Sequence, residues 1–319
     1  MLAVADDQMF INWADLPSVT SLGDERYLAH WLSYTADAPY AYQILSSQSA
    51  DAGATWSAPM SPHDDHTPTE HGFVSQYLTA SGVGMLWLDG RETPGGGMTL
   101  RTATLNASGE INAAQVLDDL VCDCCQTDVA LTASGPIAVY RDKTPDNIRD
   151  IAVARFVNGA WLPGTLVNED GWRIDGCPVN GPAIDADGKH VAIAWFTAAN
   201  GLPVVNAAVS ENGGQSFSAP IEIATGQQRG HVDIAIINQQ SVVISWIETG
   251  NPGSYEINIR GMTFDGTLGP VEIVGGTSIA NIVPQMVRIG DQLLLTWSEQ
   301  RSDVRDIVSV RVPILGDDD

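Results

Sequence analysis

A repeat of about fifty residues constrains the fold of this chain more than any other feature. Short alternating segments with one aromatic residue each recur along the sequence, and these aromatics are Trp31, Trp87, Tyr140, Trp195, Trp246 and Trp297. The intervals between them are 56, 53, 55, 51 and 51 residues. A period near fifty built from strand-like units is typical of a β-propeller, in which each repeat is one blade. The chain is therefore predicted to be all-β, with six blades.

The predicted blades cover residues 15–62, 70–118, 122–169, 176–225, 230–275 and 280–315. Each aromatic is expected on the second strand of its own blade, and the sixth repeat ends after its third strand. Residues 3–12 are expected to supply the missing outer strand, because closing the ring removes exposed sheet edges. The whole chain, 1–319, is then one domain.

The charge balance excludes several classes of partner. The chain has 39 acidic and 15 basic side chains, which gives a formal net charge of -24. Such acidity argues against nucleic acid and against docking on an anionic membrane. No apolar run approaches the ~20 residues that span a bilayer. We expect a monomer that binds a small molecule or a glycan, without nucleic acid partners or membrane insertion.

The first residues of the sequence contain no signal peptide that can be identified, since they have no basic region and no long apolar run. We expect an exported protein, periplasmic or extracellular, whose signal peptide is not part of this sequence. A cytoplasmic location stays open.

Two turns between predicted third and fourth strands share a motif. Residues 49–56 match S-x-D-x-G-x-T-W at every fixed position, and residues 210–217, three blades further on, match its relaxed form. With this Asp-box and six blades, the whole chain resembles the sialidase-like (BNR-repeat) propellers. We interpret the box as structural rather than as a sugar or metal site, because such turns lie opposite the usual ligand pocket. Its residues are Ser49, Asp51, Gly53, Thr55, Trp56, Ser210, Asn212, Gly214, Ser216 and Phe217.

Propeller topology collects the segments before the first strands and the loops after the second strands at one mouth of the channel. Carboxylates expected there, as candidates for acid–base catalysis, are Glu70, Asp89, Asp142, Asp233 and Glu299. Candidates for ligand binding are Arg91, Arg141, Arg149, Trp172, Arg229 and Arg301, with Phe73 as a further stacking face. The alternative is that neighbouring Asp and Arg residues simply pair around the mouth.

The resemblance implies a sialidase site of three arginines, a Tyr–Glu nucleophile pair and an acid–base Asp. This sequence departs from that pattern at two places. Asp15-Leu16-Pro17 stands where the family has R-I-P, and residues 279–286 of the sixth blade contain no tyrosine. We therefore expect little or no turnover of an aryl sialoside. Whether the protein is an enzyme stays open; if it is one, a glycoside hydrolase-like activity is expected.

The cysteines are the most specific local feature. Cys122, Cys124 and Cys125 open the third blade, and Cys177 opens the fourth. A disulfide from Cys177 to Cys124 or Cys125 is expected, with Cys125 favoured because Cys124 should point to the other side of an extended segment. The alternatives are free buried thiols, or a copper or zinc ion held by these cysteines with His71 and His231 at comparable places in blades two and five.

The leading interpretation is a sialidase-like propeller that binds, or also hydrolyses, a glycan or another acidic small molecule at the channel mouth. It would do so without the full sialidase catalytic set. One alternative is a metal-binding or redox protein built on the Cys/His cluster. The other is a non-catalytic scaffold for protein interactions.

Overall fold

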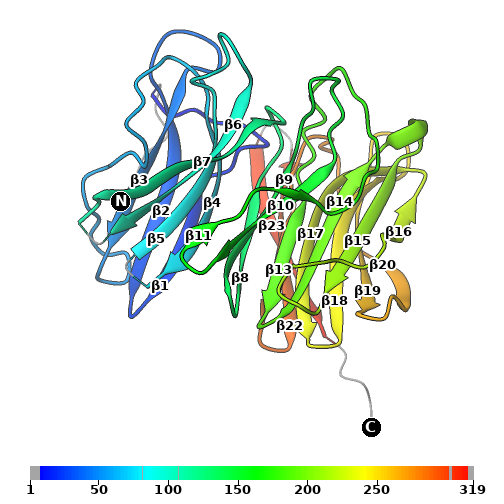
Figure 1. The fold of residues 1–319 in the computed structure, drawn as a ribbon. Helices are drawn as coiled ribbons and strands as arrows, with labels where there is room; N and C mark the ends of the chain where they lie inside the picture. Colours follow the sequence, from blue (N-terminus) through cyan, green and yellow to red (C-terminus); the bar gives the residue numbers. More distant parts are fainter. Residues whose placement is uncertain (1–7, 81, 107, 302–303, 315–319) are drawn as a thin grey trace.

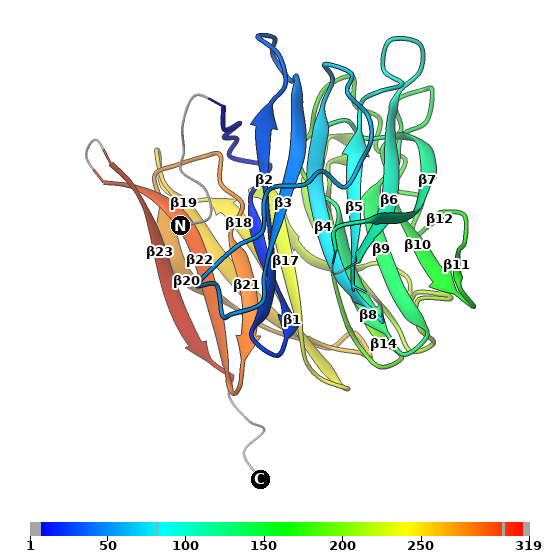
Figure 2. The same cartoon turned by 90° about the vertical axis from the view of Figure 1, so that its left-hand side faces the viewer.

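The computed structural model describes residues 8–80, 82–106, 108–301 and 304–314, and these are almost entirely β-structure. Six antiparallel sheets follow one another along the chain and stand around a common axis (Figures 1 and 2). The prediction of an all-β, six-bladed propeller is confirmed. None of the described helical residues forms a helix long and apolar enough to cross a membrane.

The first three sheets contain three, four and five strands. Their strands are β1 (Ser18–Gly23), β2 (Arg26–Tyr34) and β3 (Tyr42–Ser49); β4 (His71–Thr79), β5 (Gly82–Asp89), β6 (Met98–Asn106) and β7 (Ile111–Val121); and β8 (Asp128–Thr132), β9 (Gly135–Arg141), β10 (Ile151–Val157), β11 (Ala160–Trp161) and β12 (Thr165–Leu166).

The last three sheets contain four, four and three strands. Their strands are β13 (Ala183–Asp187), β14 (His190–Thr197), β15 (Val204–Ser210) and β16 (Ile221–Thr225); β17 (Gln228–Asn238), β18 (Ser241–Thr249), β19 (Tyr255–Thr263) and β20 (Leu268–Thr277); and β21 (Gln285–Ile289), β22 (Gln292–Arg301) and β23 (Val304–Pro313). A short 3-10 helix, η1 (Ala199–Gly201), follows β14.

The six repeated aromatics each lie on the second strand of a separate sheet, as predicted. All are at most 8% exposed, so they fill the space between blades. Several place their polar end on a carboxylate: the Trp195 indole donates to Asp170 at 2.7 Å, and the Tyr140 hydroxyl donates to Asp118 at 2.7 Å. Such pairing lets a large apolar ring be buried without leaving its N–H or O–H unsatisfied.

Neighbouring blades are joined at the axis by carboxyl groups on the inner strands. Asp128, Asp185 and Asp233 accept the backbone N–H of an inner strand in the next blade, at 2.9, 2.7 and 2.6 Å. Inner strands have a partner on one side only, so these bonds satisfy amides that would otherwise face the channel unpaired. Asp233, a predicted acid–base candidate, is thus engaged in linking blades five and six.

The N-terminal segment does not close the ring as expected where it is described. Residues 3–7 lie outside the described residues, and Met9 bridges to Ser33 on β2 of the first blade. Phe10 donates its backbone N–H to the Leu32 carbonyl and stacks on Tyr42 with ring centroids 3.9 Å apart. Stacking and pairing therefore hold Met9 and Phe10 on the first blade. Among the described residues, β23 has β22 as its strand partner.

Candidate functional site at the channel mouth

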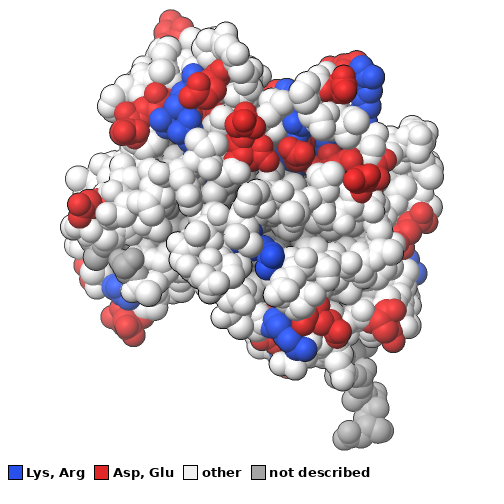
Figure 3. Space-filling model, in the orientation of Figure 1, with Lys and Arg blue, Asp and Glu red and all other residues white. Residues whose placement is uncertain are grey.

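A cavity of about 470 Å³ lies on the axis and is lined by the inner strands of all six blades. Its polar lining includes Asp15, Gln126 and His231 from three different blades. Charged side chains, mostly acidic, gather at the top of Figure 3, the end at which β14 turns into β15 in Figure 1. The segments before the inner strands and the loops after the second strands meet at this end, which is the predicted mouth.

Three polar side chains of the first two blades meet around Gly72 at the mouth. The Tyr42 hydroxyl donates to Glu70 Oε1 at 2.6 Å, and Asp15 Oδ1 accepts the Phe73 amide at 2.9 Å. A Cβ on Gly72 would lie 2.0 Å from Asp15 Oδ2 and 2.9 Å from the Tyr42 ring, so only glycine allows this approach. Asp15 Oδ2 lies beside Tyr42 without a hydrogen bond of ordinary geometry.

Burial changes the protonation of these groups. It raises the pKa of Glu70 to about 7, although the hydrogen bond from Tyr42 lowers this pKa. The charge of Asp123 raises it further. Burial also raises the pKa of Asp15 to about 7, although the Phe73 amide lowers it. Tyr42 and Asp15 are only 1% and 3% exposed, whereas Glu70 is partly exposed. Glu70 is therefore the member of the cluster that a ligand can reach.

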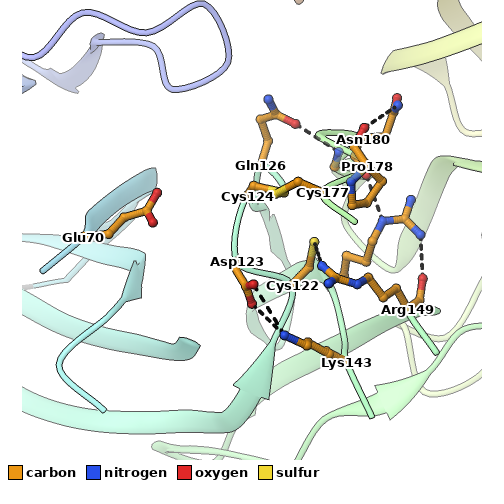
Figure 4. Close-up of a disulfide and its surroundings, with 12 residues drawn as sticks. Glu70, Cys122, Asp123, Cys124, Gln126, Lys143, Arg149, Cys177, Pro178 and Asn180 are labelled. Atoms are coloured by element: carbon orange, nitrogen blue, oxygen red, sulfur yellow. Dashed lines mark hydrogen bonds and ion pairs between the residues drawn. A yellow bond between two sulfur atoms is a disulfide. The ribbon is translucent and has the colours of Figure 1, made fainter. Parts of the chain in front are cut away.

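A second carboxyl group, that of Asp123, lies near enough to Glu70 for its charge to raise the pKa of Glu70. Figure 4 shows the segment with Asp123 and the Cys124–Cys177 disulfide opposite Glu70, with the Asp123 carboxyl group turned towards Lys143. Lys143 Nζ lies 3.1 Å from Asp123 Oδ1, and the Asp123 side chain is 42% exposed. A partly exposed carboxyl group with a raised pKa and an ion-paired one are thus neighbours at the mouth. Environments that differ in this way are typical of acid–base pairs.

The structure pairs Cys124 with Cys177 and leaves Cys122 and Cys125 as buried thiols. The expected disulfide between blades three and four is present, but the preference for Cys125 was wrong. Residues 122–127 form a turn and irregular segment rather than a strand. The alternation of an extended chain does not apply there, so Cys124 can face Cys177.

Two of the predicted ligand-binding arginines bind the chain itself. Arg141 donates to the carbonyls of Asn180, Arg149 and Phe196 at 2.9, 2.7 and 2.7 Å, and its guanidinium lies 4.8 Å from the Trp172 ring centroid. Arg149 Nη1 lies 3.2 Å from Cys122 Sγ. Arg141, Arg149 and Trp172 are at most 6% exposed, so they support the mouth from within.

Asp89 and Arg91 form a bidentate pair beside a second cavity, of about 490 Å³. Asp89 is fully buried and also accepts the Trp87 indole N–H at 2.8 Å. Burial alone would raise its pKa, but the bonds from Arg91 and the nearby His71 hold that pKa below its usual value. Asp89 therefore lacks the proton that a general acid needs.

The histidines do not join the cysteines. His71 Nε2 lies 2.7 Å from Asp65, and His231 packs edge-on against Trp13 with ring centroids 5.5 Å apart. Among the described residues, the groups that could hold a metal are Cys122 with Cys124 and Cys125, and Asp65 with His71 and Asp89. Neither combines Cys with His, so the mixed Cys/His metal site that was one alternative is not assembled in the described part of the chain.

The other predicted residues are scattered. Burial raises the pKa of Asp142, whose backbone N–H donates to the Asp150 carbonyl. Arg229 lies over the Tyr255 ring at 5.3 Å, and Glu299 stands opposite Asp306 on β23. The side chain of Arg301 lies outside the described residues.

Sequence reasoning expected Asp15 and the segment 122–128 at the mouth but named neither Asp15 nor Asp123 as a site residue, and it missed Tyr42 and Lys143. Tyr42 looked like any strand residue, and its contact with Glu70 spans 28 positions. Tyr40 was also missed: it is 61% exposed, has a φ of 62° and lies two residues before Tyr42. A tyrosine in a loop predicted to lie at the mouth was the signal in the sequence that could have identified Tyr40 as a ligand-binding candidate.

Comparison with known proteins gives the fold but no family. No protein-family model and no curated protein matches this sequence. Among solved structures, a mutant of the NanB sialidase from Streptococcus pneumoniae is similar over 98% of this chain and 71% of that chain, with a TM-score of 0.57 and 10% identity.

Two further similar structures are named as an arabinofuranosidase and an arabinanase. The α-L-arabinofuranosidase Arb93A from Fusarium graminearum matches over 97% of this chain and 94% of that chain, with a TM-score of 0.59 and 12% identity. The α-L-arabinanase from Penicillium chrysogenum, complexed with arabinobiose, matches over 94% and 93%, with a TM-score of 0.57 and 11% identity. At such identities the likeness concerns the fold alone, and this chain shares the six-bladed propeller of those proteins.

Proposed function

We propose that the channel mouth binds a glycan and hydrolyses a glycosidic bond placed between Glu70 and Asp123. The observation that carries this proposal is the Tyr42–Glu70 hydrogen bond of 2.6 Å at a partly buried carboxyl group, whose pKa the charge of the nearby Asp123 helps to raise. Two carboxyl groups with different protonation states are the basic requirement of glycoside hydrolysis.

Glu70 serves as the general acid. Its pKa of about 7 keeps a proton on the carboxyl group through the acidic and neutral range. Tyr42 acts through Glu70 rather than on the substrate, because its hydroxyl is buried and donates to Oε1. This bond fixes the carboxyl group and leaves Oε2 as the atom that delivers the proton to the leaving oxygen.

Asp123 serves as the ionised partner. Lys143 Nζ forms an ion pair with it at 3.1 Å. Its exposed side chain can activate a water molecule or contact the developing positive charge of the sugar ring. The Cys124–Cys177 disulfide fixes the segment that carries Asp123 against blade four.

Aromatic residues at the mouth offer apolar faces for a sugar ring. Tyr40 is 61% exposed beside the Tyr42–Glu70 pair, and Trp13 is partly exposed against His231. The likeness to propellers named as a sialidase, an arabinofuranosidase and an arabinanase supports a carbohydrate ligand. The disulfide supports an exported protein, since disulfides persist in oxidising compartments.

Hydrolysis of three probes tests the proposal: 4-nitrophenyl α-L-arabinofuranoside, linear arabino-oligosaccharides and 4-methylumbelliferyl N-acetylneuraminate. We expect turnover of an arabinose-containing probe and little of the sialoside. Glu70→Gln should lower kcat/KM by about 10²–10⁴-fold, as for loss of a general acid. The matched control is Glu272→Gln, which changes an exposed glutamate on the outer strand β20. Equal activity of the two variants would contradict the role of Glu70.

A further inference from the structure

The four cysteines form one sulfur cluster at the junction of blades three and four. The Sγ atoms of Cys122, Cys124 and Cys125 all lie within 4.8 Å of one another, and Cys124 is bonded to Cys177. Cys122 and Cys125 are 1% and 2% exposed, whereas Cys177 is exposed. The buried thiols of Cys122 and Cys125 therefore lie next to the disulfide, and of the two bonded cysteines Cys177 is exposed at the surface.

Charge at this cluster identifies the reactive sulfur. Arg149 is 4% exposed, and its Nη1 lies 3.2 Å from Cys122 Sγ. The ion pairs found within the described ranges include neither Arg149 nor its buried neighbour Arg141. A buried cation without a counter-charge is costly, and a thiolate on Cys122 supplies that charge.

The neighbouring groups act in the same direction. Burial would raise the pKa of Cys122, but the hydrogen bond with Cys125 and the two arginines lower it below its usual value. Burial and the adjacent Cys122 raise the pKa of Cys125. The cluster therefore holds one thiolate and one thiol, and the thiolate is the nucleophile in disulfide exchange.

We propose that Cys122 is the nucleophile of an internal thiol–disulfide exchange site that moves the disulfide from Cys124–Cys177 to Cys122–Cys125. In the first step Cys122 Sγ bonds to Cys124 Sγ, the Cys124–Cys177 bond breaks, and Cys177 leaves as a thiolate. In the second step the Cys125 thiol transfers its proton to the Cys177 thiolate. Cys125 Sγ then bonds to Cys122 Sγ, and the Cys122–Cys124 bond breaks. Cys124 leaves as the second thiolate. One disulfide opens and one closes, so no outside oxidant or reductant is consumed.

The exchange changes the mouth. The Cys124–Cys177 bond ties the segment that carries Asp123 to the loop of blade four, as Figure 4 shows. After exchange this tie is absent, and the surface presents Cys177 as a free thiol. The free Cys177 thiol would then take exposed organic disulfides as exchange partners, while Cys122 and Cys125 stay shielded.

N-ethylmaleimide provides a direct test on the native full chain. In the structure Cys177 is oxidised and cannot be alkylated, so maleimide on Cys177 reports the exchange. The labelled protein is unfolded in acid and its free thiols are blocked with a heavy-isotope maleimide. Cleavage before Asp then separates the cysteines into Asp119–Cys122, Asp123–Thr127 and Asp175–Ile184. We expect light maleimide to accumulate on Cys177 together with a disulfide between Asp119–Cys122 and Asp123–Thr127.

Variants distinguish this route from simple opening of the disulfide. Cys122→Ser should lower the rate of Cys177 labelling at least tenfold. Arg149→Gln should slow it about tenfold by removing the cation beside the sulfur, and Arg149→Lys should restore much of the rate. Lys189→Gln is the matched control, because it removes an exposed cation in the turn between β13 and β14, and its labelling rate should equal that of the wild type.

Three results would overturn the proposal. The first is an unlabelled Cys177 in the folded wild-type protein, with Cys124–Cys177 as the only linkage. The second is labelling of Cys177 at an unchanged rate in Cys122→Ser. The third is a protein with four free cysteines and a bound soft metal ion detected by elemental analysis. Circular dichroism of each variant verifies that the fold is retained, and the Arg149→Lys variant keeps the test decisive if Arg149→Gln does not fold.

Discussion

The Asp-box turns and the channel mouth are built on opposite principles. In the turn of residues 49–56, Ser49 Oγ and both oxygens of Asp51 are engaged within the same eight residues, at 2.6–2.9 Å. At the mouth, Tyr42, Glu70 and Asp15 come from distant segments, and Asp15 Oδ2 makes no hydrogen bond of ordinary geometry. The turn satisfies its own polar groups, whereas the mouth leaves one buried carboxyl oxygen without such a bond.

The two boxes repeat the same contacts despite their different sequences. Ser210 Oγ donates to Asn212 Oδ1 at 2.8 Å and accepts the Gly214 amide at 3.0 Å, as Ser49 does with Asp51 and Gly53. The box is therefore a local structural unit. We infer that substitutions in the boxes change stability, and that substitutions at the mouth change chemistry.

The largest expected difference is in turnover. Asp123→Asn should lower kcat on a cleaved arabinoside about 10²-fold or more, because the ionised partner of Glu70 is lost. Asp51→Asn, the same chemical change in the box, should leave kcat per folded molecule unchanged. Steady-state kinetics of both variants measures this contrast, and equal losses would remove the distinction between the regions.

The next contrast sets stability against affinity. Trp56 is partly exposed and bonds through its indole N–H to the Gly53 carbonyl, so Trp56→Ala should cost about 2 kcal/mol of unfolding free energy, less than for a fully buried Trp. Tyr40→Ala should lower glycan affinity several-fold with little change in stability. Urea denaturation and isothermal titration calorimetry measure the two effects, and a reversed pattern would contradict the assignment.

The pH dependence should separate the regions further. Activity should fall as pH rises through about 7, because Glu70 then loses the proton it donates. The raised pKa values of Glu70 and Asp15 also make the folded protein bind more protons than the unfolded chain, so their contribution to stability is greatest below about pH 4 and declines towards pH 7. In Glu70→Gln, the activity and the unfolding free energy should both depend less on pH. An unchanged pH dependence of the activity would exclude Glu70 as the acid.

The smallest expected effect lies within the boxes. Asn212→Asp converts the relaxed box to the form of the first, in which a carboxylate accepts both the amide and the hydroxyl of the residue four positions later. Charge-assisted bonds should raise the unfolding free energy by about 0.5–1 kcal/mol. Thermal unfolding near pH 7 measures the gain, and a loss of stability would show that the amide of Asn212 is required by Ser216.

The fold could be read from the sequence because its signals are periodic or local. The six aromatics mark the second strands, and each box closes within eight residues. The site could be read only in part. Glu70 was identified as a carboxylate of the mouth, but its hydrogen bond with Tyr42 is a tertiary contact that no spacing encodes. Arg141 was mistaken for a ligand residue because burial and three backbone carbonyls leave no mark in the sequence.

Hydrogen–deuterium exchange with and without the tightest-binding arabino-oligosaccharide tests the central claim most directly. If the mouth is the ligand site, slowed exchange should appear in residues 13–15 and 69–73, and should be absent from 49–56 and 210–217. Glu70→Gln should bind the oligosaccharide and keep the same protected segments while turnover is lost. Protection confined to the Asp-box turns, or no protection in any segment at saturating oligosaccharide, would contradict the account.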